Sequence, residues 1–216
     1  MGEKNNLLSK KKLITVLGIA LGVVVLLCVT LAILPLLSEE EAPDNSFDNN
    51  FKIDYNFYPA DYNEDIFTDE EYLRLIEYGI LEYDDGAMIT EVNDENADGY
   101  GKPVELIVDM LYAAINGDAD EYNSYFSKKY FKTNEAKDKF TMQKIYDGRI
   151  TFFACEDISE NGKQYTEYTF KLKYRIFKNN GTFRDDIGDG YRLQHVTISD
   201  REGEFKIDAI NAVRYK

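Results

Sequence analysis

The stretch Thr166–Ile176, TEYTFKLKYRI, decides the fold class of this chain, because its residues alternate in character at every second position. Even positions carry mostly apolar or aromatic side chains, and odd positions carry Glu, Thr, Lys, Lys and Arg. Successive side chains of a strand point to opposite faces of the sheet, so the pattern predicts a strand with one buried face and one charged, solvated face. The buried face needs a cover from other elements.

Turn-forming residues separate this strand from further predicted strands. These are expected over about 149–157, 190–199 and 204–214, with Arg201-Glu202-Gly203 as the turn between the last two. Asn179-Asn180-Gly181 is typical of a tight hairpin after the quoted strand. Together these segments predict a curved, mostly antiparallel sheet of four strands.

Three helices are predicted before the strands. The first begins at Pro103 and ends at Asn116-Gly117, a second follows an N-cap at Asp118, and a third extends from Asn134 to Gly148. The first helix carries apolar residues at helical spacing, namely Val104, Ile107, Leu111, Ala114 and Ile115. Helices that cover one face of such a sheet predict an α+β fold of three helices packed on four strands.

An uncharged apolar run, residues 13–37, lies near the N-terminus and is long enough to cross a bilayer as a helix. Four lysines precede it, and Glu39-Glu40-Glu41 follows it. By the positive-inside rule we expect a cytoplasmic tail over 1–12, a single-pass transmembrane helix over 13–37 and an extracytoplasmic remainder. The run is longer than the apolar part of a cleaved signal, which favours a retained signal-anchor in the cell membrane.

Charge divides the remainder of the chain into two parts. Residues 39–100 carry 20 acidic and 2 basic residues, whereas residues 101–216 carry 19 of each. We therefore expect an acidic, aromatic-rich juxtamembrane segment over 38–100 and a folded extracytoplasmic domain over 101–216. The lack of a broad basic region argues against nucleic-acid binding.

Two short elements are expected inside the acidic segment. Thr68-Asp69-Glu70-Glu71 fits a capping box, which predicts a short helix near 68–79. An irregular or short-strand stretch follows over 81–92, broken at Asp84-Asp85-Gly86.

The most specific local motif is a calcium-loop pattern. Asp94, Asn96, Asp98 and Glu105 fit the spacing D-x-[DN]-x-[DN]-G-x5-E. Spaced carboxylate and amide oxygens are the ligands that Ca²⁺ prefers, so these four residues are the candidate metal site. The alternative is an acidic, glycine-rich linker into a helix, because Lys102 stands where a ligand is expected.

Candidate reactive residues are few, and each has a structural interpretation. His195, the only histidine, is expected to be a partly exposed strand residue, and Asp208 alternates with apolar neighbours and should point outward. Cys155 lies in an apolar strand and is expected to be buried and unreactive. Most of the 17 tyrosines, including Tyr122, fit core positions. Because the sequence shows no nucleophile triad, zinc-ligand cluster or phosphate loop, a non-enzymatic protein is expected.

Two segments carry a family resemblance. Ile115-Asn116-Gly117-Asp118-Ala119-Asp120 ends the first helix, and the closing strand reads Gly203-Glu204-Phe205-Lys206-Ile207-Asp208-Ala209-Ile210. With a tyrosine-rich helix between them, residues 102–216 resemble the NTF2-like (cystatin-like) superfamily. The resemblance implies a cone-shaped pocket, in which some member enzymes use an Asp or His as general base. The layout of a short tail, one span and such a domain is similar to VirB8-like proteins, assembly components of conjugative type IV secretion channels.

We therefore expect a bacterial-type, membrane-anchored, extracytoplasmic binding or scaffolding module that is not an enzyme. Two alternatives stay open, a VirB8-like channel component and a pocket enzyme of the isomerase or dehydratase kind. The expected partners are the lipid bilayer through 13–37 and either another protein or a second copy, and the one candidate cofactor is Ca²⁺. A ligand binder should show a closed apolar pocket, and an enzyme should show a carboxylate or His with a raised pKa inside it.

Overall fold

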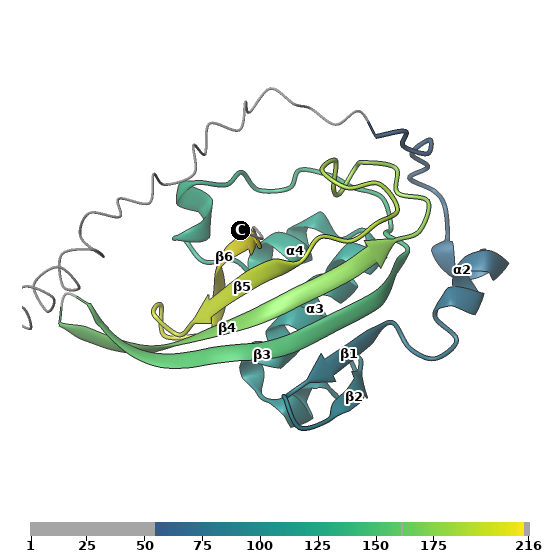
Figure 1. Cartoon of the computed structure of the whole chain (residues 1–216). Helices are drawn as coiled ribbons and strands as arrows, with labels where there is room; N and C mark the ends of the chain where they lie inside the picture. The colour runs from purple at the N-terminus through teal and green to yellow at the C-terminus, as the bar shows by residue number, and fades with distance from the viewer. Residues whose placement is uncertain (1–54, 161, 214–216) are drawn as a thin grey trace, which may run out of the picture. The chain divides into compact units, whose positions relative to one another are not determined.

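The computed structural model describes residues 55–160 and 162–213 of the chain (Figure 1). Its strands are β1 (Leu81–Asp84), β2 (Ile89–Val92), β3 (Ile145–Glu160), β4 (Lys163–Ile176), β5 (Gln194–Ser199) and β6 (Lys206–Ala212). Its helices are η1 (Ile66–Thr68), α2 (Glu70–Leu75), η2 (Ala97–Tyr100), α3 (Lys102–Asn116), α4 (Ala119–Ser124) and η3 (Tyr130–Lys132), where η marks a 3₁₀-helix.

The strands form one mixed sheet of six strands in the order β2-β1-β3-β4-β5-β6, so the predicted four-stranded sheet is wrong. The two additional strands come from 81–92, where the expected break is a hairpin turn. The carboxylate of Asp85 accepts the N–H groups of Ala87 and Met88 at 2.8 and 2.9 Å and thereby shapes this turn. β1 pairs parallel with β3, with Leu81 opposite Gly148, while the other neighbouring strands pair antiparallel.

Helices α3 and α4 cover the inner face of the sheet (Figure 1). The even positions of β4 that are buried there are Phe170, Leu172, Tyr174 and Ile176, as the alternation predicted. The predicted bounds of α3 are confirmed to within a residue, and the N-cap of α4 is confirmed, because the Asp118 side chain accepts the N–H of Glu121. Between the two helices, Gly117 adopts a left-handed conformation with φ of 72°.

The third predicted helix, over 134–148, is wrong. Residues 134–144 form an irregular segment that leads into β3. The amide of Asn134 donates backward to the carbonyl of Tyr130 at 3.0 Å, so it closes the turn before it and does not open a helix. The side-chain Nδ2 of Asn123 in α4 donates to the carbonyl of Lys137 at 2.7 Å, and its Oδ1 accepts the N–H of Lys137 at 2.9 Å.

The predicted tight hairpin at Asn179-Asn180-Gly181 is also wrong, because the chain makes a long loop over 177–193 there. The side chain of Asn179 is buried, and its amide donates to the carbonyls of Arg184 and Ile187 at 3.1 and 2.9 Å. The side chain of Asn179 thus holds residues 184–187 of the loop in place, whereas a two-residue turn would contain no such segment.

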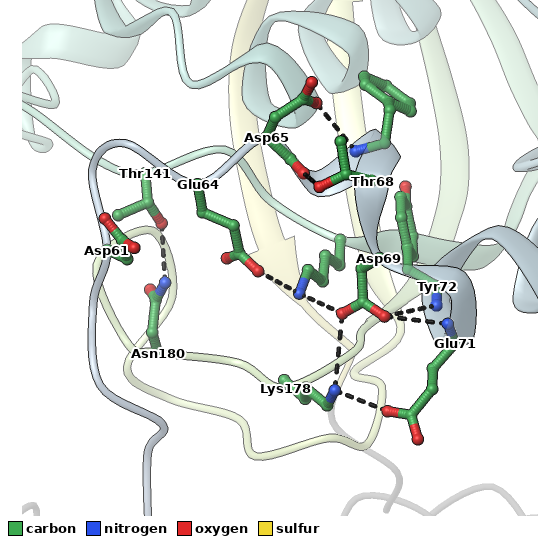
Figure 2. Close-up of polar contacts among 12 residues, drawn as sticks. Asp61, Glu64, Asp65, Thr68, Asp69, Glu71, Tyr72, Thr141, Lys178 and Asn180 are labelled. Atoms are coloured by element: carbon green, nitrogen blue, oxygen red, sulfur yellow. Dashed lines mark hydrogen bonds and ion pairs between the residues drawn. The ribbon is translucent and has the colours of Figure 1, made fainter.

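A cluster of charges attaches α2 and the residues before it to the sheet (Figure 2). The buried ammonium of Lys144 lies 2.6 Å from carboxylate oxygens of both Glu64 and Asp69. Lys178 lies 2.6 Å from Glu71 and 3.5 Å from Asp69. Each ammonium has two carboxylates and each carboxylate has an ammonium, so we call this group the ionic clasp.

Asp69 is the centre of the ionic clasp and also the N-cap of α2. Its side chain accepts the N–H groups of Glu71 and Tyr72, so the cap is Asp69 and not the predicted Thr68 (Figure 2). The hydrogen bond from Lys144 lowers the pKa of Asp69 to about 2, against the opposing effect of burial. Tyr72 completes the attachment, because its hydroxyl donates to the carbonyl of Ile145 at 2.9 Å.

The membrane prediction also requires correction. Within residues 55–160 and 162–213, no helix combines the length and the apolar character needed to cross a bilayer. The apolar run 13–37, the tail 1–12 and residues 38–54 lie outside the described residues. The described structure therefore does not support the single-pass membrane assignment or the extracytoplasmic location that depended on it.

Candidate functional site

The predicted calcium-loop residues have other roles in the structure or face solvent. The side chain of Asn96 accepts one backbone N–H and donates to one backbone carbonyl, which organises its own turn. Glu105 binds the ammonium of Lys102 at 2.6 Å, and Asp94 and Asp98 are exposed. In the part of the chain that the structure describes, no three His, Cys, Asp or Glu side chains lie close enough together to hold a metal ion.

The other singled-out residues lie apart from one another. His195 lies on the outer face of the sheet, where its ring stacks on Phe153 with centroids 5.1 Å apart. Asp208 is buried, contrary to prediction, because a β-bulge between β5 and β6 interrupts the alternation, and it accepts a hydrogen bond from Ser199 at 2.9 Å. Cys155 is exposed, contrary to prediction, because β3 extends beyond the part of the sheet that the helices cover.

A pocket of about 170 Å³ lies between the helices and the inner face of the sheet. It is lined by Tyr122 of α4, Tyr130 of η3, Tyr174 of β4, Gln194 of β5 and Arg184 of the 177–193 loop, among others. For comparison, an apolar cavity of about 150 Å³ can hold one benzene molecule. The pocket therefore has room for one ring-sized molecule or group.

Arg184 organises the polar side of this pocket. Its Nε and Nη2 donate to the two carboxylate oxygens of Asp186 at 2.9 and 2.8 Å. Its Nη1 donates to the hydroxyl of Tyr174 at 3.3 Å and to Oε1 of Gln194 at 3.1 Å. This planar fork fixes three neighbouring side chains at once, which is a typical use of a guanidinium group.

Asp185 and Asp186 both line the pocket, and Asp186, the less exposed of the two, is the candidate base. Burial alone would raise its pKa, but the hydrogen bonds and charges of Arg184 and Arg192 outweigh burial and lower the pKa to about 2. A carboxylate with so low a pKa is a weak proton acceptor near neutral pH. Asp186 therefore serves to position Arg184.

The tyrosine hydroxyls of the pocket are available as hydrogen-bond donors. A tyrosine phenol is protonated at neutral pH, and burial raises the pKa of Tyr122, Tyr130 and Tyr174 further. Within the described residues, the hydroxyls of Tyr122 and Tyr130 form no hydrogen bond, and that of Tyr174 accepts one from Arg184 but donates none. The pocket thus contains three phenol groups with unused hydrogen-bonding capacity, and we call it the tyrosine pocket.

A larger hollow, about 370 Å³, lies along the β3–β4 hairpin. Several of its polar groups bind one another: Asp200 accepts the N–H of Thr166 at 2.8 Å, and Asp157 accepts the Thr166 hydroxyl at 3.1 Å. The hydroxyl of Tyr165 is held between Glu160 and Arg201. These contacts engage the side chains of Asp157, Tyr165, Thr166 and Asp200, whereas those of Ser159 and Gln164 form no hydrogen bond within the described residues.

The outer face of the sheet is a separate candidate surface, which we call the basic-aromatic face. It consists of Arg149, Phe153, Lys171, Lys173, Arg175, Tyr191 and His195. The ammonium of Lys171 lies 4.6 Å from the centre of the Phe153 ring, and the charged groups of Lys173 and Arg175 lie 5.2 and 5.5 Å from that of Tyr191. Phe153 and Tyr191 are each about half exposed.

Sequence reasoning did not identify Arg184 or Gln194 as site residues. Tyr122 and Tyr174 were identified, but as core positions, because an inward-facing tyrosine has the same periodicity whether its hydroxyl is used or not. An arginine two residues before an aspartate, as in Arg184 and Asp186, is a signal that the sequence does show, but it indicates a site only when the loop is known to return to the sheet.

No protein-family model, curated protein or solved structure matches this chain. The resemblance to the NTF2-like superfamily and the layout of VirB8-like proteins therefore stay predictions.

Proposed function

We propose that the protein is a non-enzymatic binding module that holds a ring-sized polar ligand in the tyrosine pocket. The observation that carries this proposal is the unused hydrogen-bonding capacity of Tyr122, Tyr130 and Tyr174. All three side chains line the pocket, and none of their hydroxyls donates a hydrogen bond within the described residues. A ligand that completes these hydrogen bonds accounts for the arrangement.

The pocket favours binding over catalysis. An isomerase or dehydratase of the expected kind needs a carboxylate or histidine with a raised pKa, whereas the pKa of Asp186 is lowered and His195 lies on the opposite face of the sheet. The pocket also differs from the closed apolar cavity expected of a ligand binder, because Arg184, Asp186 and Gln194 line it. The ligand should therefore be polar.

A fragment screen by thermal denaturation tests this proposal. Ring-sized polar compounds that occupy the pocket should raise the melting temperature of the full-length chain, because a ligand that binds the folded state stabilises it by mass action. The same compounds should raise the melting temperature of Tyr122→Phe less, and that of Tyr78→Phe, an exposed tyrosine, as much as wild type. Equal shifts in all three proteins would place binding outside the pocket.

A protein-binding role is a second proposal, favoured by the basic-aromatic face. The chain has a net charge of −15, yet this face gathers four lysine and arginine residues around exposed aromatic rings. Arg149 and Arg175 pair with carboxylates, whereas Lys171 and Lys173 form no salt bridge within the described residues. Charge complementarity points to an acidic polypeptide segment of another protein as the partner.

Charge reversal tests this second proposal. A fluorescent peptide rich in Asp and Glu with one Phe should bind the full-length chain at low salt, and Lys173→Glu should weaken that binding about tenfold or more. Lys163→Glu makes the same charge change at an exposed position at the start of β4, away from the face. Identical affinities of the two variants would contradict a specific role of the face.

A further inference from the structure

We infer that the ligand of the tyrosine pocket is a small carboxylate, recognised by a surplus of hydrogen-bond donors. This inference rests on the proposed function and names the chemical class of its ligand. The donors and acceptors that line the pocket differ in how many of them already have partners inside the protein.

Arg184 engages four of the acceptor atoms that line the pocket. Both carboxylate oxygens of Asp186, Oε1 of Gln194 and the hydroxyl oxygen of Tyr174 each accept one of its N–H groups. Asp186 accepts a further hydrogen bond from Arg192 at 2.8 Å. Acceptors that are already engaged have little capacity to bind a donor group of a ligand.

Donors are left over beside these engaged acceptors. The O–H groups of Tyr122, Tyr130 and Tyr174 have no acceptor within the described residues, and neither has the amide NH₂ of Gln194. Phenols are protonated and can donate at neutral pH, and burial moves the pKa of these three still higher. The side chains of Tyr122 and Tyr174 are more than nine-tenths buried, so each is held in place by its neighbours.

The number and kind of free donors select a carboxylate. An ionised carboxylate has two oxygens with about four lone-pair sites and no donor of its own. A carboxamide brings two N–H donors, which the neutral phenol oxygens of Tyr122 and Tyr130 can accept only weakly compared with a carboxylate, and an ammonium ion brings only donors. The two charged groups at the rim, Lys137 and Asp185, are exposed and of opposite sign, so they do not reverse this preference.

Three probes of similar shape distinguish carboxylate, carboxamide and ammonium ligands. Benzoate, benzamide and benzylamine each attach one polar group to a ring of the size that the pocket accommodates. Their affinities for the full-length chain at pH 7 are measured by ligand-observed NMR titration. Benzoate should bind with a dissociation constant of the order of 1 mM, as expected of so small a molecule, and at least tenfold more tightly than either analogue.

Substitutions at the free hydroxyls test the assignment to these donors. Tyr122→Phe and Tyr130→Phe should each weaken benzoate binding about tenfold, because each removes one hydrogen bond to a charged group. Neither hydroxyl has a partner among the described residues of the free protein, so neither variant should lower the melting temperature. That second readout separates a binding role from a structural one, and Tyr78→Phe serves as the control that should change neither quantity.

The outcomes of this titration are distinct. Tighter binding of benzylamine than of benzoate would overturn the carboxylate inference and leave the pocket as a ligand site. Benzoate binding that is unchanged in both variants would overturn it as well, because these hydroxyls would then not hold the carboxylate. Failure of all three probes to bind at about 10 mM, ten times the expected constant, would contradict the pocket proposal itself.

Discussion

Replacing Gly117 with alanine is expected to destabilise the protein by about 3 kcal/mol. Gly117 ends α3 with φ of 72°, a left-handed conformation that side-chain-bearing residues adopt at a cost. An added Cβ would also lie 2.9 Å from the backbone N of Met142 and 3.1 Å from the backbone carbonyl carbon of Thr141. These are backbone atoms that cannot rotate away, so the strain of the turn and the steric clash should add.

Substitutions at two further glycines distinguish the backbone strain from the steric clash. Gly162 has φ of 76°, but no atom lies within 4 Å of the position that an added Cβ would take, so Gly162→Ala should cost only the conformational strain, about 1 kcal/mol. Gly99 has neither a positive φ nor a neighbour within 4 Å, and Gly99→Ala should leave stability nearly unchanged. Urea denaturation of the three variants gives the comparison. If Gly117→Ala costs no more than Gly162→Ala, the close approach to residues 141–142 is not important for stability.

Replacing Lys144 with methionine is expected to cost about 3 kcal/mol, because it leaves the carboxylates of Glu64 and Asp69 facing each other without their shared cation. The side chain of Lys144 is only 6% exposed, so water cannot take its place easily. Lys178→Met is the matched control. Lys178 is one-third exposed, and its loss should cost less than about 1 kcal/mol.

The contribution of the ionic clasp should also depend on pH. The pKa of Asp69 is lowered from 3.8 to about 2, so its contribution is fully present above 3.8 and is lost as the pH falls toward 2. The difference in unfolding free energy between wild type and Lys144→Met should therefore narrow over this interval. If the difference in unfolding free energy between the two proteins stays constant from pH 5 to about pH 2, the Asp69–Lys144 pair is not the source of that difference.

Local patterns predicted the elements whose structure depends on local contacts. The alternation in β4 and the apolar face of α3 each reflect burial on one side of a single element, and the cap at Asp118 lies beside the helix that it opens. Asn134 shows where this reasoning fails. Asparagine suits both the beginning of a helix and the end of a turn, and contacts with Tyr130 and α4 decide between the two.

Elements that depend on distant contacts were not predictable in the same way. The short strand β1 is stable because it pairs with β3, more than 60 residues later in the chain, with Leu81 opposite Gly148. The pocket is a similar case, because Arg184 reaches Tyr174 and Gln194 only when Asn179 has folded the loop back. A sequence pattern identifies each of these residues as polar or apolar, but not the partner it meets.

The central claim is that the tyrosine pocket binds a ligand. Its most direct test is an NMR titration in which benzoate is added to the full-length chain carrying ¹³C-labelled tyrosine rings. The signals of Tyr122, Tyr130 and Tyr174, assigned by single replacement with phenylalanine, should shift together along one saturable binding curve. The signal of Tyr78 should stay in place. Shifts confined to exposed tyrosines, or no saturable shift of the three pocket signals, would contradict the account of this pocket as a ligand site.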